Sequence, residues 1–306
     1  MGQCAPAGRS GGRKLSDASR AKQPAHYYIG RAPDNVGRPD PPDAVSHAGS
    51  TRGVDLPSRR RVVVALPPVA KKIVVIPTFN ERENIVKLVS EVLVQDPELE
   101  VLVVDDRSPD GTGELVAGMA RTDPRVHLLA RDDRRGLGPA YKSGFAWALE
   151  HGAELIVQMD ADFSHAPAML PRFFAEIANA DLVLGSRYIN GITVVNWPIE
   201  RLLISYCGNA YVRRVLRMRI RDATGGFKCW RREALAAVDL NAVRSNGYAF
   251  QIEMTYRAAC RHLKIREIPI IFMDRTAGDS KMNTRISLEA LWIVWWLRLN
   301  QLVHRL

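Results

Sequence analysis

Two aspartates, Asp160 and Asp162, flank Ala161 directly after the apolar residues 155–159. Carboxylates at positions i and i+2 of an extended or turning segment can share a hard divalent cation such as Mg²⁺ or Mn²⁺, which also takes phosphate oxygens as ligands. A cation bound there would neutralise the charge on a departing diphosphate. The same triplet is also common in solvated loops, so the elements around it decide between a metal site and an ordinary loop.

A second acidic pair, Asp105 and Asp106, follows the apolar residues 101–104. The Ser-Pro-Asp-Gly sequence after it favours a turn, and a carboxylate here can cap the next helix or contact a base or ribose. Further on, residues 134–141 form a glycine-rich turn before a helix, where backbone N–H groups can meet phosphate. An ordinary helix start explains this turn equally well, so neither segment decides the function alone.

Two cations, Arg275 and Lys281, lie in a glycine-containing segment that follows the apolar residues 268–272. Such a loop can fold over a diphosphate and supply positive charge to it. An ordinary solvated loop has the same composition.

Alternating apolar runs and helical patterns would position these residues. Strands are predicted at 73–76, 101–104, 126–129, 155–159 and 182–184, with helices ending near 94, beginning at 111, spanning 138–150 and beginning at 167. This alternation predicts an α/β fold with a mainly parallel sheet covered on both faces. Asn80 and Glu83 predict a capping box at the first helix.

Ligands of such sheets bind beyond the carboxyl ends of the strands. The two acidic pairs follow predicted strand ends. Asn80–Glu81 and Ser186–Arg187 follow two further strand ends. Four separate segments are therefore expected to converge on one crevice.

The two ends of the chain differ from this pattern. Residues 1–72 carry 13 Lys and Arg against 5 Asp and Glu, a net charge of +8, and 9 of the 18 prolines, whereas residues 73–306 carry 30 against 28, a net charge of +2. So few large apolar residues cannot offset the entropy of ordering, which predicts a disordered basic tail. The tail can bind anionic lipid or nucleic acid, or be solvated without a partner.

The C-terminal residues 286–306 are predicted to form an amphipathic helix. Its apolar run, 290–297, is far shorter than the roughly 20 residues that span a bilayer, so no transmembrane segment is expected. Tryptophans with basic flanks suit a membrane interface, although a terminal helix packed on the domain explains the same spacing. The expected apolar stripe consists of Leu288, Leu291, Trp292, Trp295, Leu299, Leu302 and Leu306. The four widely spaced cysteines are typical of a reducing cytoplasm and predict neither a disulfide framework nor a zinc site.

The order of the motifs resembles that of the polyprenol (dolichol) phosphate mannose synthases of glycosyltransferase family 2. The resemblance covers about residues 73–285 and rests on PTFNE at 77–81, VVDDRSPDGT at 103–112, GLGPAY at 136–141, MDADFSH at 159–165, GSRY at 185–188, DATGGFKCW at 222–230, SNGYAFQIEM at 245–254 and DRTAGDSKM at 274–282. It implies a Rossmann-like GT-A domain at 73–285, between the tail at 1–72 and the helix at 286–306.

The resemblance also implies substrates and roles. GDP-mannose would be the donor, polyprenyl phosphate the acceptor, and Mg²⁺ or Mn²⁺ the cofactor, with inversion at the sugar. Asp160, Asp162 and Arg187 would be catalytic, and the two aspartates would bind the metal. The donor would be held by Pro77, Phe79, Glu81, Val104, Asp105, Asp106, Ala161, Arg275 and Lys281.

The chemistry of the implied acceptor is consistent with these residues. A phosphate monoester is already an anion at neutral pH, so a general base is less necessary than for a hydroxyl acceptor. The enzyme must align the reactants and stabilise charge on the leaving diphosphate. A lipid acceptor implies peripheral attachment to the cytoplasmic face of a membrane, through the terminal helix or an integral-membrane partner protein.

Three alternatives remain at this point. The same fold can use UDP-glucose or another sugar nucleotide, and the Asp-x-Asp triplet does not distinguish these donors. A non-catalytic subunit that binds nucleotide and tethers a complex to membrane is disfavoured because both carboxylates of the triplet are intact. A nucleic-acid-binding protein is disfavoured because residues 73–306 are nearly neutral and lack an aromatic-basic RNA motif.

Overall fold

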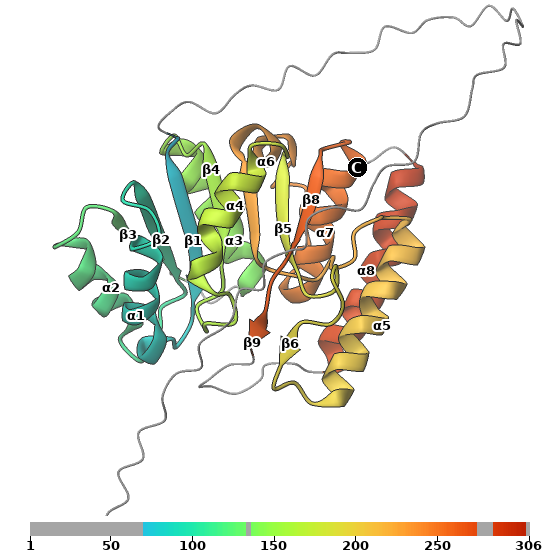
Figure 1. Ribbon diagram of the computed structural model, residues 1–306, viewed down its shortest axis with the longest axis horizontal. Coiled ribbons are helices and arrows are strands. Elements are labelled where there is room, and N and C mark those ends of the chain that lie inside the picture. The colour runs from blue at the N-terminus through green and yellow to red at the C-terminus, as the bar shows by residue number, and fades with distance from the viewer. Residues whose placement is uncertain (1–69, 133–135, 274–283, 304–306) are drawn as a thin grey trace, which may run out of the picture. The chain divides into compact units, whose positions relative to one another are not determined.

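The computed structural model describes residues 70–132, 136–273 and 284–303, and of residues 284–291 the backbone alone. Strands and helices alternate through most of this range (Figure 1). The strands are β1 (Lys72–Thr78), β2 (Leu99–Asp105), β3 (Val126–Ala130), β4 (Leu155–Gln158), β5 (Leu182–Ser186), β6 (Val194–Val195), β7 (Lys228–Arg231), β8 (Ile265–Pro269) and β9 (Phe272–Met273). The helices are α1 (Arg82–Leu93), α2 (Thr112–Ala120), α3 (Leu137–Glu150), the short 3₁₀ helix η1 (Pro167–Met169), α4 (Leu170–Ile177), α5 (Ile199–Leu216), α6 (Arg232–Ala237), α7 (Gly247–Cys260) and α8 (Thr284–Leu302).

The main sheet has the strand order β3-β2-β1-β4-β7-β5-β8. The first four of these strands pair in parallel, as do β5 and β8, which confirms the predicted mainly parallel sheet. The antiparallel strand β7 lies between β4 and β5, and the sequence did not predict it. Its residues Lys228 and Arg231 are charged, so it lacks the apolar run that marks a buried strand.

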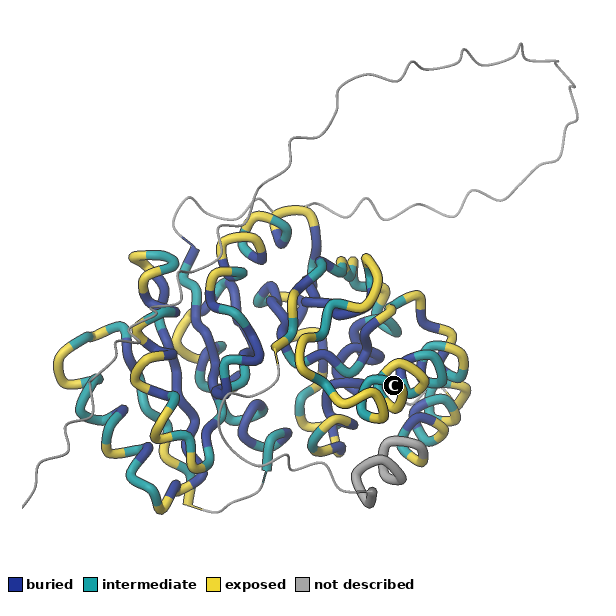
Figure 2. Tube along the Cα trace, turned by 60° about the horizontal axis from the view of Figure 1, so that its bottom comes forward, coloured by how far each residue is buried: buried dark blue, intermediate teal, exposed yellow. Residues whose placement is uncertain are grey.

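Helices cover both faces of the main sheet. Val74 and Ile76 of β1 pack with α1, α2 and α4 on one face. Ile73 and Val75 pack with α3, α6 and α7 on the other. Buried residues accordingly concentrate along the strands, while exposed ones lie on the outer turns of the helices (Figure 2). Each central strand is apolar on both sides for this reason.

The loops at the carboxyl ends of β1 and β2 are tied together where α1 begins. The N-cap of α1 is Glu81 and makes no side-chain capping hydrogen bond, so the predicted capping box of Asn80 and Glu83 is wrong. The backbone N–H of Glu81 instead donates to Thr112 Oγ1 (3.1 Å), and that of Arg82 donates to Asp110 Oδ2 (3.0 Å). The VVDDRSPDGT segment therefore caps α1 from a distance, and it fixes the loop that follows β1.

Helices α5, α7 and α8 share a third apolar cluster, and α5 and α8 lie side by side (Figure 1). Val294 and Leu297 of α8 are fully buried in it. Trp292 and Trp295 of the predicted apolar stripe are exposed, as are Leu299 and Leu302 of the same stripe. The helix is thus apolar toward the domain, through Val294 and Leu297, and also away from it, through the exposed stripe.

Candidate active site

A cavity of about 290 Å³ opens beyond the carboxyl ends of the strands. The loops after β1, β2, β4 and β5 meet there with the first turns of α3, α5 and α7. Its lining comprises Pro77, Thr78, Phe79, Glu81, Asp106, Gly136, Leu137, Ala140, Asp160, Ala161, Asp162, Ser164, His165, Arg187, Trp197, Arg201, Thr224, Gly226, Gly247, Tyr248, Gln251 and Phe272.

Most residues that the sequence singled out lie in this lining. They are Pro77, Phe79, Glu81, Asp106, Asp160, Ala161, Asp162 and Arg187. Val104 and Asp105 do not line the cavity. Arg275 and Lys281 lie outside the described residues.

Asp105 is a buried acceptor that organises the loop beneath the cavity. Its carboxylate accepts hydrogen bonds from Thr78 Oγ1 (2.8 Å), Ser108 N (2.9 Å) and Ser108 Oγ (2.6 Å). Asp106, in contrast, faces the cavity and forms an ion pair with Arg131 Nη1 at 2.7 Å. Of the two residues, Asp106 is therefore placed to meet a ligand, while Asp105 holds the wall; direct contact of Asp105 with the donor stays a prediction.

The two carboxylates of the Asp-x-Asp triplet have different surroundings. Asp162 is buried, and its Oδ1 accepts hydrogen bonds from the N–H (3.1 Å) and the hydroxyl (2.6 Å) of Ser164, which closes a tight turn. The side chain of Asp160 is 33% exposed, and its Oδ1 accepts a hydrogen bond from the Tyr141 hydroxyl (3.0 Å). The turn thus presents the carboxylates at the cavity wall from a fixed backbone.

His165 supports this turn in its neutral form. The backbone N–H of Asp160 donates to His165 Nδ1 at 3.0 Å, which places the ring proton on Nε2. Burial lowers the pKa of His165, outweighing the opposite effect of Asp160. Its ring stacks on Phe227, with 4.8 Å between centroids. Burial likewise raises the pKa of Tyr141 well above its usual value, and the Asp160 carboxylate adds to this, so that hydroxyl stays a donor.

The carboxylate oxygens of the Asp-x-Asp triplet fit a hard cation that a bound ligand would also coordinate. Among the described residues, no group of three or more His, Cys, Asp and Glu side chains is arranged to hold a metal ion. Asp160 and Asp162 supply carboxylate oxygens alone, which would suit Mg²⁺ or Mn²⁺, hard cations that also take phosphate oxygens and water as ligands.

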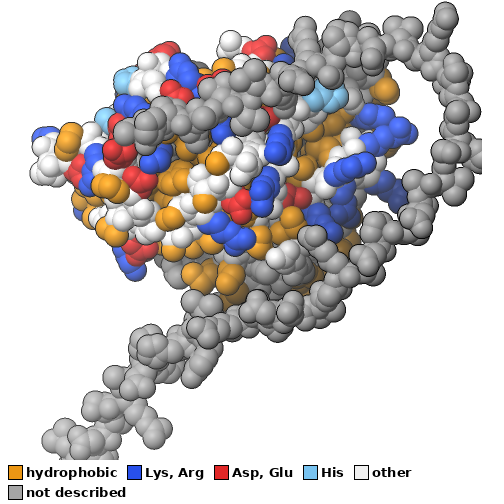
Figure 3. Space-filling view, turned by 45° about the horizontal axis from the view of Figure 1, so that its top comes forward, with side chains coloured by type: hydrophobic (Ala, Val, Ile, Leu, Met, Phe, Trp, Pro, Cys, Tyr) orange, Lys and Arg blue, Asp and Glu red, His pale blue; other side chains and the backbone are white. Residues whose placement is uncertain are grey.

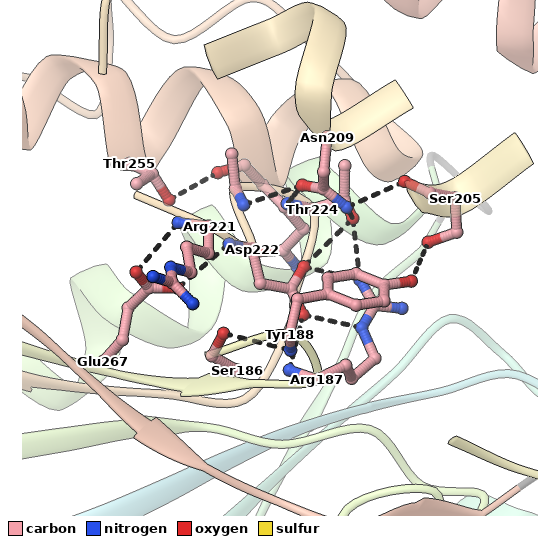
Figure 4. A network of polar contacts seen from close by, with 12 residues as sticks. Ser186, Arg187, Tyr188, Ser205, Asn209, Arg221, Asp222, Thr224, Thr255 and Glu267 are labelled. Carbon is pink, nitrogen blue, oxygen red and sulfur yellow. Dashed lines mark hydrogen bonds and ion pairs between the residues drawn. The ribbon is translucent and has the colours of Figure 1, made fainter. Parts of the chain in front are cut away.

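Arg187 is held in a buried network with Asp222 (Figure 4). Its Nε and Nη2 donate to the two Asp222 oxygens at 2.7 and 2.6 Å, and Nη2 also donates to Thr224 Oγ1 at 2.7 Å. Burial opposes both charges, but Arg187 lowers the pKa of Asp222 and Asp222 raises the pKa of Arg187. No described residue accepts a hydrogen bond from Nη1 of Arg187, which leaves this group for the cavity.

Aromatic rings enclose the same guanidinium. Its Cζ lies 5.3 to 5.5 Å from the ring centroids of Tyr188, Trp197 and Phe272. Trp197 and Phe272 belong to the segments brought together by the pairing of β6 with β9. The indole N–H of Trp197 is buried and has no partner among the described residues. Aromatic rings therefore surround the guanidinium of Arg187 on this side of the cavity.

Lys228 lies fully buried beneath the cavity floor. Its Nζ donates to Gln251 Oε1 (2.7 Å) and to the Gln251 carbonyl (3.0 Å). Burial lowers its pKa to about 7, although Asp222 and Asp160 act in the opposite direction. A neutral amine keeps N–H groups for both contacts, so the site tolerates loss of the charge.

This lowered pKa predicts a pH-dependent stability. Between the folded value of about 7 and the ordinary value of 10.5, the unfolded chain holds a proton that the folded chain lacks, so the unfolding free energy rises with pH. The wild-type value minus that of Lys228→Met should grow by about 2 kcal/mol from about pH 7.5 to about pH 9, as measured by urea denaturation. A constant difference would mean that the amine remains charged in the folded state.

Sequence reasoning assigned no role to several lining residues. His165, Thr224, Gly226, Tyr248 and Gln251 lie within motifs that carried the resemblance, and only their motif context marked them. Trp197 and Arg201 lie outside those motifs. Their four-residue spacing at the start of a helix was the available signal, since the Arg201 Cζ lies 4.2 Å from the Trp197 ring centroid.

Solved structures with a similar fold contain UDP or UDP-glucose. Glucosyl-3-phosphoglycerate synthase from Mycobacterium tuberculosis, in complex with Mn²⁺, UDP-glucose and glycerol 3-phosphate, is 17% identical, with a TM-score of 0.56 over 74% of this chain and 80% of that one. A complex of the same enzyme with Mn²⁺, UDP and phosphoglyceric acid gives a TM-score of 0.58 at 17% identity, over 75% and 78% of the two chains. At this identity the likeness concerns the fold, and it confirms the predicted GT-A class.

Curated relatives are much closer in sequence. Polyprenol monophosphomannose synthase from Mycolicibacterium smegmatis is 46% identical over 235 residues, which are 76% of this chain and 89% of the relative. Undecaprenyl-phosphate mannosyltransferase from Micrococcus luteus is 46% identical over 217 residues, 71% of this chain and 89% of the relative. The sequence model described as glycosyl transferase family 2 matches residues 73–238. The chain therefore belongs to glycosyl transferase family 2 and is a glycosyltransferase.

Proposed function

We propose that this enzyme transfers mannose from GDP-mannose to a polyprenyl phosphate, with a divalent cation and with inversion at the sugar. The observation that carries the proposal is the joint placement of the Asp160–Asp162 pair and Arg187 in one cavity wall. Support for the substrates comes from the names of two relatives, each 46% identical to this chain.

The reaction joins two anionic reactants at one carbon atom. An oxygen of the acceptor phosphate forms a bond to the anomeric carbon, while the bond from that carbon to the diphosphate oxygen breaks and GDP leaves. Attack in line with the leaving group inverts the sugar. A divalent cation, when bound by Asp160 and Asp162, supplies positive charge for the diphosphate.

The side chains of the cavity suit the remaining requirements. Nη1 of Arg187 is a charged donor for a phosphate oxygen, and Asp222 keeps this guanidinium in place. The loop of Pro77, Phe79 and Glu81 and the carboxylate of Asp106 form the wall that suits the nucleoside. Nδ1 of His165 already accepts the Asp160 N–H, so this ring is not placed to act as a general base, and an acceptor that is already ionised does not need one.

A transfer assay with three labelled donors tests the proposal. The purified protein, Mg²⁺ and a short-chain polyprenyl phosphate are mixed separately with GDP-mannose, UDP-glucose and UDP-N-acetylglucosamine. Label is expected in the organic phase from GDP-mannose alone. Label from a UDP-sugar would replace the donor and keep the reaction type. Binding of a nucleotide without transfer from any donor would favour a missing membrane partner or the non-catalytic alternative.

We infer further that the enzyme attaches peripherally to an anionic membrane. Among the described residues, no helix combines the length and the apolar character that crossing a bilayer requires. Ile199, Leu203 and Ile204 of α5 and Trp292 and Trp295 of α8 are more than half exposed. Figure 3 shows Lys and Arg side chains beside hydrophobic ones on the side where these two helices lie. Exposed tryptophans next to cations suit the lipid interface.

Replacing Trp292 and Trp295 together by serine is expected to weaken binding to phosphatidylglycerol vesicles by at least about tenfold, because the variant loses apolar area from the interface. Co-sedimentation measures the bound fraction. Val94→Ser is the matched control, since Val94 is 82% exposed at the end of α1 and belongs to neither helix. Equal binding of the double variant and the wild type would exclude α8 from the attachment.

A further inference from the structure

A row of buried polar side chains runs beneath the cavity floor. The Trp230 indole N–H donates to Gln158 Oε1 (3.0 Å), and Gln158 Nε2 donates to Gln251 Oε1 (3.0 Å). From the other side, Lys228 Nζ donates to the same Gln251 oxygen (2.7 Å). Trp230, Gln158 and Lys228 are fully buried, and Gln251 is 2% exposed.

The chemistry at the two ends of this row determines the direction of every hydrogen bond in it. An indole N–H can only donate, so Gln158 must turn its oxygen toward Trp230 and its NH₂ group toward Gln251. A lysine amine held against a carbonyl and an amide also donates to both. Gln251 therefore receives two donors and must turn its oxygen away from the cavity. Its amide orientation is thus imposed from both sides.

The NH₂ group of Gln251 is consequently the part of the side chain that remains for the cavity. Gln251 lines the cavity, and no described residue accepts a hydrogen bond from its Nε2. Gly226 leaves this region open: a Cβ atom there would lie 3.4 Å from Asp160 Oδ2 and 3.5 Å from Gln251 Nε2. This amide donor faces the cavity next to the carboxylate that is placed to bind the cation. A donor that faces the cavity at a fixed orientation is placed to meet an acceptor atom of a bound ligand.

We propose that Gln251 binds a hydroxyl group of the transferred sugar through its NH₂ group, and that Lys228 and the Trp230–Gln158 pair act as positioning residues that hold this orientation. The inference rests on the proposed function, since it needs a sugar nucleotide in the cavity. An uncharged amide donor is matched to an uncharged hydroxyl, whereas the diphosphate has cations at hand in Arg187 and in the metal that Asp160 and Asp162 suit. Gln251 thereby contributes to recognition of the sugar separately from the nucleotide.

Two affinities measured side by side test this inference. Isothermal titration calorimetry with Mg²⁺ gives the dissociation constants of GDP and of GDP-mannose. The dissociation constant of GDP divided by that of GDP-mannose isolates the contribution of the sugar to binding. Gln251→Met removes the donor and is expected to lower this ratio by at least about tenfold, mainly by weakening GDP-mannose. Gln251→Glu keeps an oxygen for Lys228 and Gln158 while removing the donor, and the same loss is expected if the methionine variant folds poorly.

The positioning role has its own variant and control. Lys228→Met leaves Gln251 in place but releases its oxygen, so the ratio is expected to fall by about threefold or more. Lys142→Met is the matched control and should leave the ratio unchanged, because Lys142 donates to the Val243 carbonyl (3.0 Å) and does not line the cavity.

The outcomes distinguish this inference from the proposed function. Wild-type ratios in both Gln251 variants would overturn the sugar contact while the proposed reaction stands. If the wild type uses UDP-glucose instead, the same ratio measured with UDP and UDP-glucose tests Gln251 and only the donor changes. Binding of no sugar nucleotide by the wild type would overturn both.

Discussion

Replacing Asp162 by asparagine is expected to lower the transfer rate by at least about 1000-fold, equivalent to about 4 kcal/mol of transition-state stabilisation. The variant loses one of two negative charges that can hold a divalent cation against the diphosphate. The amide keeps an oxygen at Oδ1, so it can still accept the two hydrogen bonds from Ser164 that close the turn. The loss should therefore concern the chemistry and leave the fold unchanged.

The measurement is the initial rate of label transfer at several Mg²⁺ and Mn²⁺ concentrations, with circular dichroism to compare the folds. Ser164→Ala is the matched control, because it removes a hydrogen bond to the same carboxylate and leaves the charge in place. We expect this variant to keep a rate within about tenfold of the wild type. An asparagine variant as active as the alanine control would contradict the metal site at Asp160 and Asp162.

Replacing Asp222 by alanine is expected to lower the unfolding free energy by about 3 to 5 kcal/mol, because it leaves the guanidinium of Arg187 buried without its counterion. Arg187 is 5% exposed and Asp222 is fully buried. Asp222 also accepts a hydrogen bond from the Arg187 backbone N–H at 2.9 Å, so the loop after β5 loses a second anchor. Urea denaturation at neutral pH measures the change.

A double variant separates the contribution of the Arg187–Asp222 ion pair to stability from that of its surroundings. Arg187→Met combined with Asp222→Ala removes both charges, and it should be less destabilised than the sum of the single variants because no lone charge remains buried. The pH dependence has a defined sign as well. Since folding lowers the pKa of Asp222, the stabilisation is present above its ordinary value of 3.8 and disappears as the pH falls through the folded value. Additive single and double effects would mean that the ion pair contributes nothing of its own.

The parallel part of the sheet could be predicted because burial on both faces leaves a simple mark in the sequence. Ile73, Val74, Val75 and Ile76 are all inaccessible to solvent, so the run carries no polar alternation. Strand β7 could not be found in this way. Its Arg231 is 9% exposed, and three carbonyl groups at the end of α4, those of residues 177, 178 and 180, accept its hydrogen bonds. Such compensation is visible only after the chain has folded.

The candidate site was likewise predictable only in part. Asp106, Asp160 and Arg187 follow strand ends, and the topology of a parallel sheet brings strand ends together. Gln251 and Trp197 reach the cavity from the second turn of α7 and from the segment before α5. Their positions depend on how those helices pack, and helix packing has no short-range signature. Asp105 is the opposite case. Its residue type and its place after a strand suggested contact with a ligand, but its carboxylate accepts hydrogen bonds from neighbouring residues and anchors the loop.

The insertion of β7 between β4 and β5 has a consequence for how the chain is made. Strands β1 to β4 are complete once residue 158 has been synthesised, but β5 gains its partner on that side only when residues 228–231 have followed. Until then the edge of β4 is unpaired, and an open, apolar strand edge is a template for association with other chains. Since a ribosome adds roughly 5–20 residues per second, this interval lasts several seconds. Nascent chains that stall before β7 are therefore the ones most exposed to aggregation and most dependent on chaperones.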